Sequence, residues 1–165
     1  MPKTVLLVED NGDEVELTLR AFRENRLPCD VRVARDGAEA IEQLLGGAHG
    51  EAPALPAVVL LDLHLPGIDG FGVLERIRAE ARTALLPVVV MTSSDERSDV
   101  LTSYRLGANS FVRKPLTFRE LVELTRRLSD YWLDVNHSPS PAWSLATDGA
   151  DRGCTAPGPA RTRAG

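Results

Sequence analysis

A run of four apolar residues that ends in an aspartate constrains this chain more than any other feature. Residues 58–61 read VVLL, and Asp62 follows them directly. An unbroken apolar run of this length is typical of a central strand in a parallel sheet, because helices cover both faces of such a strand. A carboxylate at its carboxyl end lies where open α/β sheets bind their ligands. Taken alone, Asp62 is equally well explained as a helix cap or a turn residue.

Strand and helix patterns alternate along the chain. Apolar runs predict strands at residues 4–8, 30–34, 58–61, 87–92 and 110–112. Helical spacing predicts helices at 11–26, 38–45, 71–78, 95–106 and 117–134. Five such repeats predict an α/β fold, a doubly wound parallel sheet of five strands with five helices and right-handed crossovers. Capping pairs mark two of the helix starts, Asn11 with Glu14 and Thr117 with Glu120.

Composition places the chain among ordinary globular proteins. Of its 165 residues, 43% are apolar and 26% are charged. No apolar run approaches the roughly 20 residues of a membrane span, and no signal-peptide layout is present, so we expect a cytoplasmic protein without a membrane partner. Cys29 and Cys154 lie far apart and are expected to be reduced thiols. The net charge of −5 argues against a nucleic-acid surface and favours a cation or a basic partner.

The chain changes character near residue 137. Residues 1–136 have enough apolar residues for one core and form the predicted domain. Of the 29 residues from 137 to 165, 20 are Gly, Pro, Ser, Ala or Thr. Such a segment buries too little surface to offset its ordering entropy, so we predict a disordered tail. The alternative is that Trp143 docks back onto the domain.

Chemically active side chains follow four of the five predicted strands. Glu9 and Asp10 follow the first strand and Asp62 the third, Thr92 ends the fourth, and Lys114 follows the fifth. The carboxyl ends of parallel strands share one edge of the sheet, so these side chains should converge. Three carboxylates crowded together repel one another and need a cation, and oxygen ligands favour Mg²⁺. Each residue alone has an ordinary explanation as a cap, a strand end or a surface side chain.

Four segments together resemble the receiver domain of response regulators. They are LLVEDN at 6–11, LLDLHLPGIDG at 60–70, VVMTS at 89–93 and FVRKP at 111–115. The resemblance covers residues 4 to about 130. It implies a flavodoxin-like sheet with the strand order 2-1-3-4-5, and a role in two-component signalling. It does not imply an enzyme beyond the domain's own phosphorylation and dephosphorylation.

The resemblance implies a role for each acidic residue. Asp62 accepts a phosphoryl group from a phosphohistidine on a sensor histidine kinase. Asp10 and Asp62 bind Mg²⁺ directly, the backbone carbonyl of His64 is a third ligand, and Glu9 acts through water. The side chain of His64 has the simpler alternative of pointing to solvent.

The resemblance also implies how the phosphoryl group is held and sensed. Lys114 places a positive charge beside its oxygens, and the Thr92 hydroxyl donates a hydrogen bond to them. Lys114–Pro115 is expected to be a cis peptide. Thr92 and Phe111 form the switch, although Phe111 lacks the hydroxyl of the tyrosine frequent there. Ser94, like His64, occupies a position that tunes dephosphorylation.

No room remains for a DNA-binding domain, so the chain is expected to act by protein contact or phosphate relay. The last helix carries more apolar residues than one buried face needs: Phe118, Leu121, Val122, Leu124, Leu128, Tyr131, Trp132 and Leu133. This surplus predicts a homodimer through the last strand and helix, with phosphorylation changing the surface formed by the fourth helix, fifth strand and fifth helix.

Within the family, the chain resembles regulators that pair with bacterial and cyanobacterial phytochromes. Two other functions stay open. A Mg²⁺-dependent phosphohydrolase would need a second aspartate at the position of His64. A pseudo-receiver acting only as a binding module would be expected to lack Asp10, Asp62 or Lys114.

Overall fold

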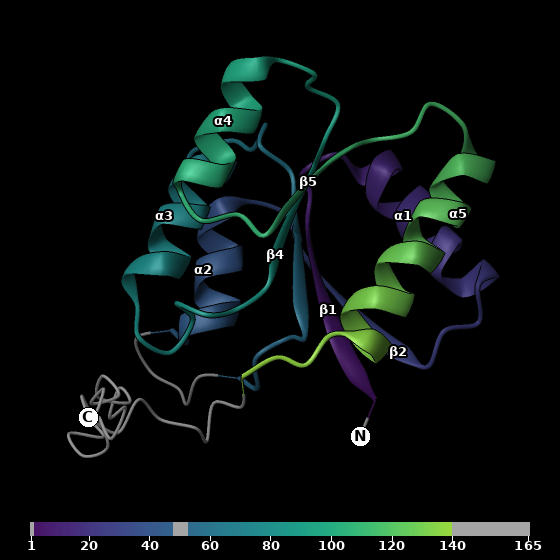
Figure 1. The fold of residues 1–165 in the computed structure, drawn as a ribbon, viewed down its shortest axis with the longest axis horizontal. Coiled ribbons are helices and arrows are strands. Elements are labelled where there is room, and N and C mark those ends of the chain that lie inside the picture. Colours follow the sequence, from purple (N-terminus) through teal and green to yellow (C-terminus); the bar gives the residue numbers. More distant parts are fainter. Residues whose placement is uncertain (1, 48–52, 140–165) are drawn as a thin grey trace, which may run out of the picture.

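The computed structural model describes residues 2–47 and 53–139. Their five strands form one parallel sheet in the order β2-β1-β3-β4-β5 (Figure 1), which confirms the predicted fold. The strands are β1 (Lys3–Val8), β2 (Cys29–Ala34), β3 (Val58–Leu61), β4 (Val88–Thr92) and β5 (Ser110–Arg113). The helices are α1 (Gly12–Glu24), α2 (Gly37–Leu45), α3 (Gly70–Ala79), α4 (Arg97–Arg105) and α5 (Phe118–Ser129). The predicted tail from residue 140 on, with Trp143 and Cys154, lies outside the described residues.

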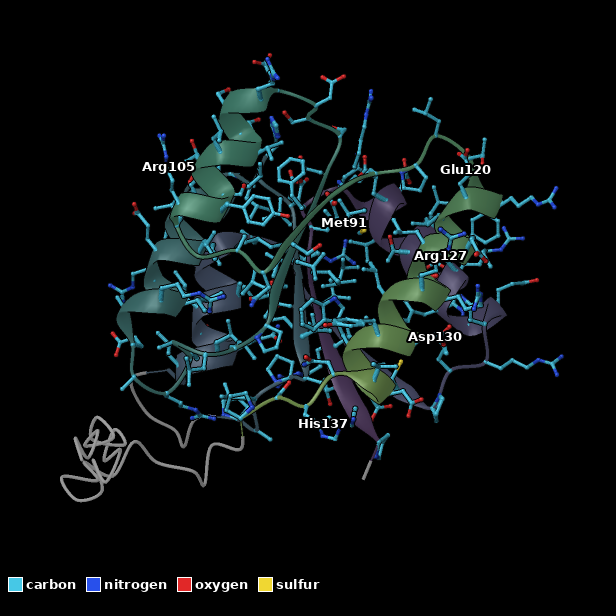
Figure 2. The ribbon with its side chains drawn as sticks, in the orientation of Figure 1. Met91, Arg105, Glu120, Arg127, Asp130 and His137 are labelled. Atoms are coloured by element: carbon cyan, nitrogen blue, oxygen red, sulfur yellow. The ribbon has the colours of Figure 1, made fainter. Side chains whose placement is uncertain are left out.

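Helices cover both faces of the sheet. Figure 1 shows α2, α3 and α4 on one side and α1 with α5 on the other. Side chains alternate along β3, so Val59 and Leu61 enter the core beneath α2 and α3, while Val58 and Leu60 enter the core beneath α1 and α5. Met91 of β4 belongs to this second core (Figure 2). Burial on both faces explains why the run at 58–61 contains no polar residue.

The edge strands are less buried than the central ones. β2 and β5 end the strand order, and both expose part of their side chains. Cys29 at the start of β2 is a half-buried free thiol. Burial and the neighbouring Asp30 raise the pKa of this thiol, which keeps it protonated at neutral pH.

Only one of the two predicted capping boxes forms. At α5, Thr117 accepts a hydrogen bond from the backbone N–H of Glu120, and the Glu120 carboxylate accepts one from the Thr117 N–H. At α1, Asn11 caps the helix by accepting from the N–H groups of Asp13 and Glu14. The Glu14 side chain does not return to Asn11, because it contacts Lys114 instead. The expected pairing of Asn11 with Glu14 as a capping box was therefore wrong.

The last helix continues to residue 135, but its final turn has a different geometry. α5 passes at Asp130 into the π-helical segment η1 (Asp130–Val135). Trp132 and Leu133 pack against the core beneath α1 and α5, whereas Tyr131 is 50% exposed. The predicted extension to about residue 134 is therefore confirmed, and only part of its apolar surface is buried.

None of the helices in the described part of the chain is long and apolar enough to span a membrane.

Candidate functional site

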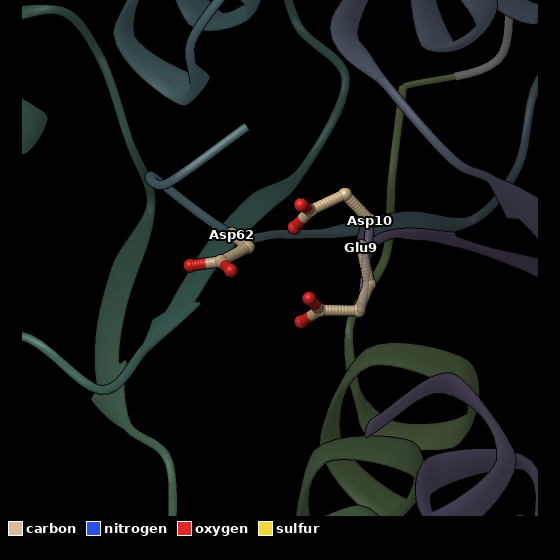
Figure 3. A group of neighbouring side chains, drawn as sticks. All are labelled: Glu9, Asp10 and Asp62. Carbon is tan, nitrogen blue, oxygen red and sulfur yellow. The ribbon is translucent and has the colours of Figure 1, made fainter. Parts of the chain in front are cut away.

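The carboxyl ends of β1 and β3 bring three carboxylates together. Val8 pairs with Leu61, and the N–H of Asp62 donates to the Val8 carbonyl at 3.1 Å. The next residues are consequently neighbours, and the carboxylate oxygens of Glu9, Asp10 and Asp62 lie within 4.8 Å of one another. Figure 3 shows their side chains converging from the two strand ends. The sequence predicted this convergence.

Burial distinguishes the three carboxylates. Glu9 and Asp62 are 2% and 6% exposed, whereas Asp10 is exposed. The cluster therefore opens to solvent on the side of Asp10. Burial and the nearby Asp62 charge raise the pKa of Glu9 to about 7, against the opposing effect of Lys114. Additional positive charge at this site would favour the ionised form of Glu9.

Lys114 reaches the same cluster from the end of β5. Its ammonium donates to Asp62 Oδ2 at 3.1 Å and also to the carboxylates of Glu9 and Glu14. Burial disfavours its charge, but the hydrogen bonds that it donates to Glu14 and Glu9 and the charge of Asp62 outweigh that effect and raise the pKa of Lys114 above its ordinary value. Lys114 is therefore a permanent cation beside Asp62.

The turn after β3 fixes the position of Asp62. Gly70, the first residue of α3, lies so close to this turn that a Cβ there would be 2.3 Å from the Asp62 carbonyl oxygen. Only glycine allows this approach of helix and strand end. The Gly70 N–H donates to the Leu63 carbonyl at 3.0 Å, and Asp69 caps α3 through the Gly72 N–H.

Thr92 is buried at the end of β4, and it is linked to the lysine through the backbone. The Lys114 N–H donates to the Thr92 carbonyl at 2.7 Å. The Thr92 hydroxyl accepts a long hydrogen bond of 3.4 Å from the Ser94 N–H. The Ser94 hydroxyl in turn donates to Asp99 on α4 at 2.5 Å. These bonds tie the Thr92 side chain to the loop that leads into α4.

Two expectations near the site have definite outcomes. The predicted cis peptide at Lys114–Pro115 was wrong, because every peptide bond in the described ranges is trans. Lys114 reaches the cluster without it, because β5 pairs with β4 up to Arg113 and so delivers the next residue to the sheet edge. His64 has an exposed side chain, and only its backbone N–H contacts Asp62, at 3.4 Å.

The residues present fit a hard divalent cation. The group contains four carboxylates, those of Glu9, Asp10, Asp62 and Glu14, and a single ammonium, so it carries excess negative charge. Three of them place oxygen atoms close enough to share one ion, and carboxylate oxygens are the ligands that Mg²⁺ prefers.

Sequence reasoning missed the role of Glu14. Its position in the first turn of a helix suggested capping, which is the commoner use of a glutamate there. The signal available was indirect: Glu14 lies one helical turn after Asp10, on the strand-end side of α1. The contact itself, between elements 100 residues apart in the sequence, appears only in the structure.

Comparison with known proteins agrees with this geometry. The model of the response regulator receiver domain family matches residues 5–126. The probable methanogenesis regulatory protein FilR2 of Methanothrix harundinacea is 39% identical over 86% of this chain and 90% of its own length.

Two solved structures are similar over most of the chain. The phosphorylated cyanobacterial phytochrome response regulator RcpA is 33% identical, with a TM-score of 0.78 over 85% of this chain and all of that one. The bacteriophytochrome response regulator AtBRR is 43% identical, with a TM-score of 0.64 over 78% of this chain and 94% of that one.

Proposed function

The chain belongs to the response regulator receiver family, and we propose that it is a single-domain response regulator whose Asp62 accepts a phosphoryl group. One observation carries this assignment to Asp62. Asp62 is a buried carboxylate at the end of the central strand β3 that contacts Lys114 and shares an oxygen cluster with Glu9 and Asp10. Asp10 is exposed and makes no such contact with the lysine. Glu9 also contacts Lys114, but burial raises its pKa to about 7, so it is partly protonated at neutral pH.

The donor in this proposal is a phosphohistidine of a sensor histidine kinase. A carboxylate oxygen of Asp62 forms the new P–O bond as the P–N bond breaks, and the bonding electrons stay on the ring nitrogen, which takes up a proton. Lys114 lies beside the acceptor and offsets negative charge on the phosphoryl oxygens. The same residues, with water, reverse the modification by hydrolysis.

The cation-binding residues in this proposal are Asp10, Asp62 and the backbone carbonyl of His64, with Glu9 acting through water. When bound, Mg²⁺ would neutralise charge on the phosphoryl oxygens and orient them. Asp10 fits this role because it is the exposed member of the cluster and therefore the entry side. Glu9 is buried beside Asp62 and accepts hydrogen bonds from the Asn11 N–H and the Lys114 ammonium, and we propose an indirect role for it.

We propose that Thr92 and Phe111 transmit the modification. The Thr92 hydroxyl would leave the Ser94 N–H and donate to a phosphoryl oxygen, and Phe111 would follow on β5. The long Thr92–Ser94 bond supports this, since it is weak and easily exchanged. The affected surface is that of α4, β5 and α5, where Leu101 and Tyr104 are exposed.

A phytochrome is the proposed kinase partner. RcpA and AtBRR are described as phytochrome response regulators, and both align with most of this chain. The proposed folded unit is residues 1–136, and the remaining residues form a tail of unassigned role.

A homodimer through β5 and α5 is also proposed. Among the strands that the structure describes, β5 pairs with β4 alone, which leaves one edge of its backbone without a partner strand there. Tyr131 and Val135 at the end of the same layer are 50% and 62% exposed, more than expected for apolar side chains without a partner surface.

Acetyl phosphate in the presence of Mg²⁺ tests the phosphoacceptor. Intact-mass measurement should show one added phosphoryl group on the wild type and none on Asp62→Asn. Asp13→Asn, an exposed aspartate of α1, is the matched control and should be modified like the wild type. Modification of Asp62→Asn to the same extent would contradict the assignment.

Light scattering with size-exclusion chromatography tests the dimer. Tyr131→Ser combined with Val135→Ser should shift the wild-type dimer to a monomer. Leu17→Ser, a comparably exposed apolar residue on α1, should leave it unchanged. A monomeric wild type, with and without beryllofluoride, would rule the dimer out.

A further inference from the structure

Glu14 is the one member of the charged cluster without a role in the function proposed above. It lies in the first turn of α1, its side chain is 41% exposed, and its carboxylate forms an ion pair with Lys114. Asp13, its neighbour in the same turn, is exposed and has no such contact among the described ion pairs. The ion pair with Lys114 therefore distinguishes Glu14 from Asp13.

The ammonium of Lys114 is held from three directions. It has three N–H donors, and it has three carboxylate partners: Glu9 at the end of β1, Asp62 at the end of β3, and Glu14 on α1. Three partners on three separate elements define the position of the ammonium far better than one would. The side chain of Lys114 is only 14% exposed, so water can replace little of this contact.

Cation binding would affect these three partners differently. Glu9 and Asp62 belong to the oxygen cluster that fits a divalent cation, whereas Glu14 does not. A divalent ion there would draw on the charge of Glu9 and Asp62, and it would also repel the nearby ammonium. Glu14 is then the only partner whose negative charge remains available to Lys114 alone.

We propose that Glu14 is a positioning residue that holds the Lys114 ammonium beside Asp62 while a divalent cation is bound, and so lets the two positive charges share the site. This role of Glu14 rests on the proposed function, since holding Lys114 matters only if Asp62 accepts a phosphoryl group. It can still be tested separately, because cation binding can be measured without phosphorylation.

A double-mutant cycle followed by Mg²⁺ titration calorimetry tests the proposal. Glu14→Gln keeps the shape of the side chain and removes its charge, and it should weaken Mg²⁺ binding about fivefold. Lys114→Met should tighten binding, since it removes the repelling charge. In the Lys114→Met background, Glu14→Gln should change the affinity by less than about twofold, because the partner through which it acts is gone.

A further variant and a spectroscopic signal complete the test. Asp13→Asn removes the same charge from the same helical turn and should leave Mg²⁺ affinity within about twofold of the wild type. The ¹⁵N resonance of the Lys114 ammonium in Mg²⁺-saturated protein should shift with Glu14→Gln and not with Asp13→Asn. Circular dichroism establishes that each variant is folded.

The possible results distinguish a specific role of Glu14 from a general effect of its charge. An equal loss of affinity from Glu14→Gln in both backgrounds would overturn the proposal in favour of a general field effect, and so would no loss in the wild-type background. A wild type that binds Mg²⁺ with the predicted cycle but is not modified at Asp62 would leave the role of Glu14 standing and reject the phosphoacceptor assignment.

Discussion

Two half-buried cations lie at opposite ends of the sheet, and they are held by different kinds of oxygen. Lys114 lies at the carboxyl end, and its side-chain ammonium donates to three carboxylates. Arg78, at the end of α3, lies near the amino ends of β4 and β5. Its guanidinium donates to the carbonyls of Gly107 and Leu86 and to the side-chain oxygen of Asn109, each at 2.9 Å.

The difference appears in the pKa values of the two residues. Burial lowers the pKa of Arg78, and its neutral acceptors do not offset that effect. The carboxylates around Lys114 overcome burial and raise its pKa. The neutral oxygens around Arg78 fix the position of its guanidinium and add no negative charge that a further cation could neutralise. Four carboxylates in one cluster with a single ammonium leave excess negative charge, so only the carboxyl end should respond to a divalent cation.

The largest loss of stability is expected at Arg78. Arg78→Met keeps much of the apolar stem but leaves the carbonyls of Leu86 and Gly107 without their donor, and it should lower the free energy of unfolding by about 3 kcal/mol. The loss should be the same with chelator and with saturating Mg²⁺ in urea unfolding. Arg76→Met, an exposed position on the same helix, is the control and should change little. A loss that Mg²⁺ reversed would contradict the contrast between the two ends.

A smaller and cation-dependent loss is expected at Lys114. Lys114→Met leaves Glu9 and Asp62 without a counter-charge and should cost about 2 kcal/mol in chelator. The loss is limited because Glu9, with a pKa of about 7, can take up a proton. Saturating Mg²⁺ should reduce the deficit, because the ion supplies the missing positive charge. Urea unfolding at both conditions measures this, and a deficit that Mg²⁺ left unchanged would show that the lysine is structural like Arg78.

Removing a carboxylate from the cluster should raise the free energy of unfolding in chelator, whereas removing Lys114 lowers it. Asp10→Asn reduces repulsion within the cluster and should stabilise the protein in chelator by about 0.5 kcal/mol. In saturating Mg²⁺ the order should reverse, since the wild type gains binding free energy that the variant largely loses. Thermal unfolding at both conditions reveals the crossover. Asp13→Asn should show none, and a variant that was less stable than the wild type in chelator would argue against charge crowding.

The contrast also explains what could be predicted from the sequence. The carboxyl end was predictable because its chemistry follows the strands directly: Asp62 comes straight after a buried run, and Lys114 after β5. Strand ends in a parallel sheet share one edge, so sequence position alone placed these residues together. The receiver resemblance then added the roles that geometry by itself leaves open.

The contacts that were missed join elements that are distant in sequence. Arg78 meets Gly107 and Asn109 across 29 and 31 residues, and Glu14 meets Lys114 across 100. No local pattern encodes such pairs, and a glutamate at a helix start has a sufficient local explanation as a cap. The π-helical geometry of η1, whose Trp132 and Leu133 pack against the core, was also not predicted, since no local pattern in the sequence marks it.

The smallest effect is expected from a third charged group, which lies at the surface and is open to solvent. On α5, Glu123 pairs with Arg126 and Arg127, and Arg126 pairs with Asp130, at 2.8 to 2.9 Å; Arg127 and Asp130 are labelled in Figure 2. Hydrogen bonds from Arg126 and Arg127 lower the pKa of Glu123 to about 2. A lowered pKa means that ionised Glu123 stabilises the fold when the pH is above the ordinary pKa of a glutamate. This stabilisation is lost as the pH falls towards 2.

Solvent should nevertheless remove most of this stabilisation, since exposed pairs are screened by water and salt. Glu123→Gln should therefore leave the thermal midpoint at neutral pH and physiological salt within experimental error, with Mg²⁺ or without it. Its acid-unfolding curve between pH 5 and pH 2 should follow that of the wild type closely. A Glu123→Gln variant as destabilised as Lys114→Met would mean that pairing, and not burial, determines what a charged cluster contributes in this fold.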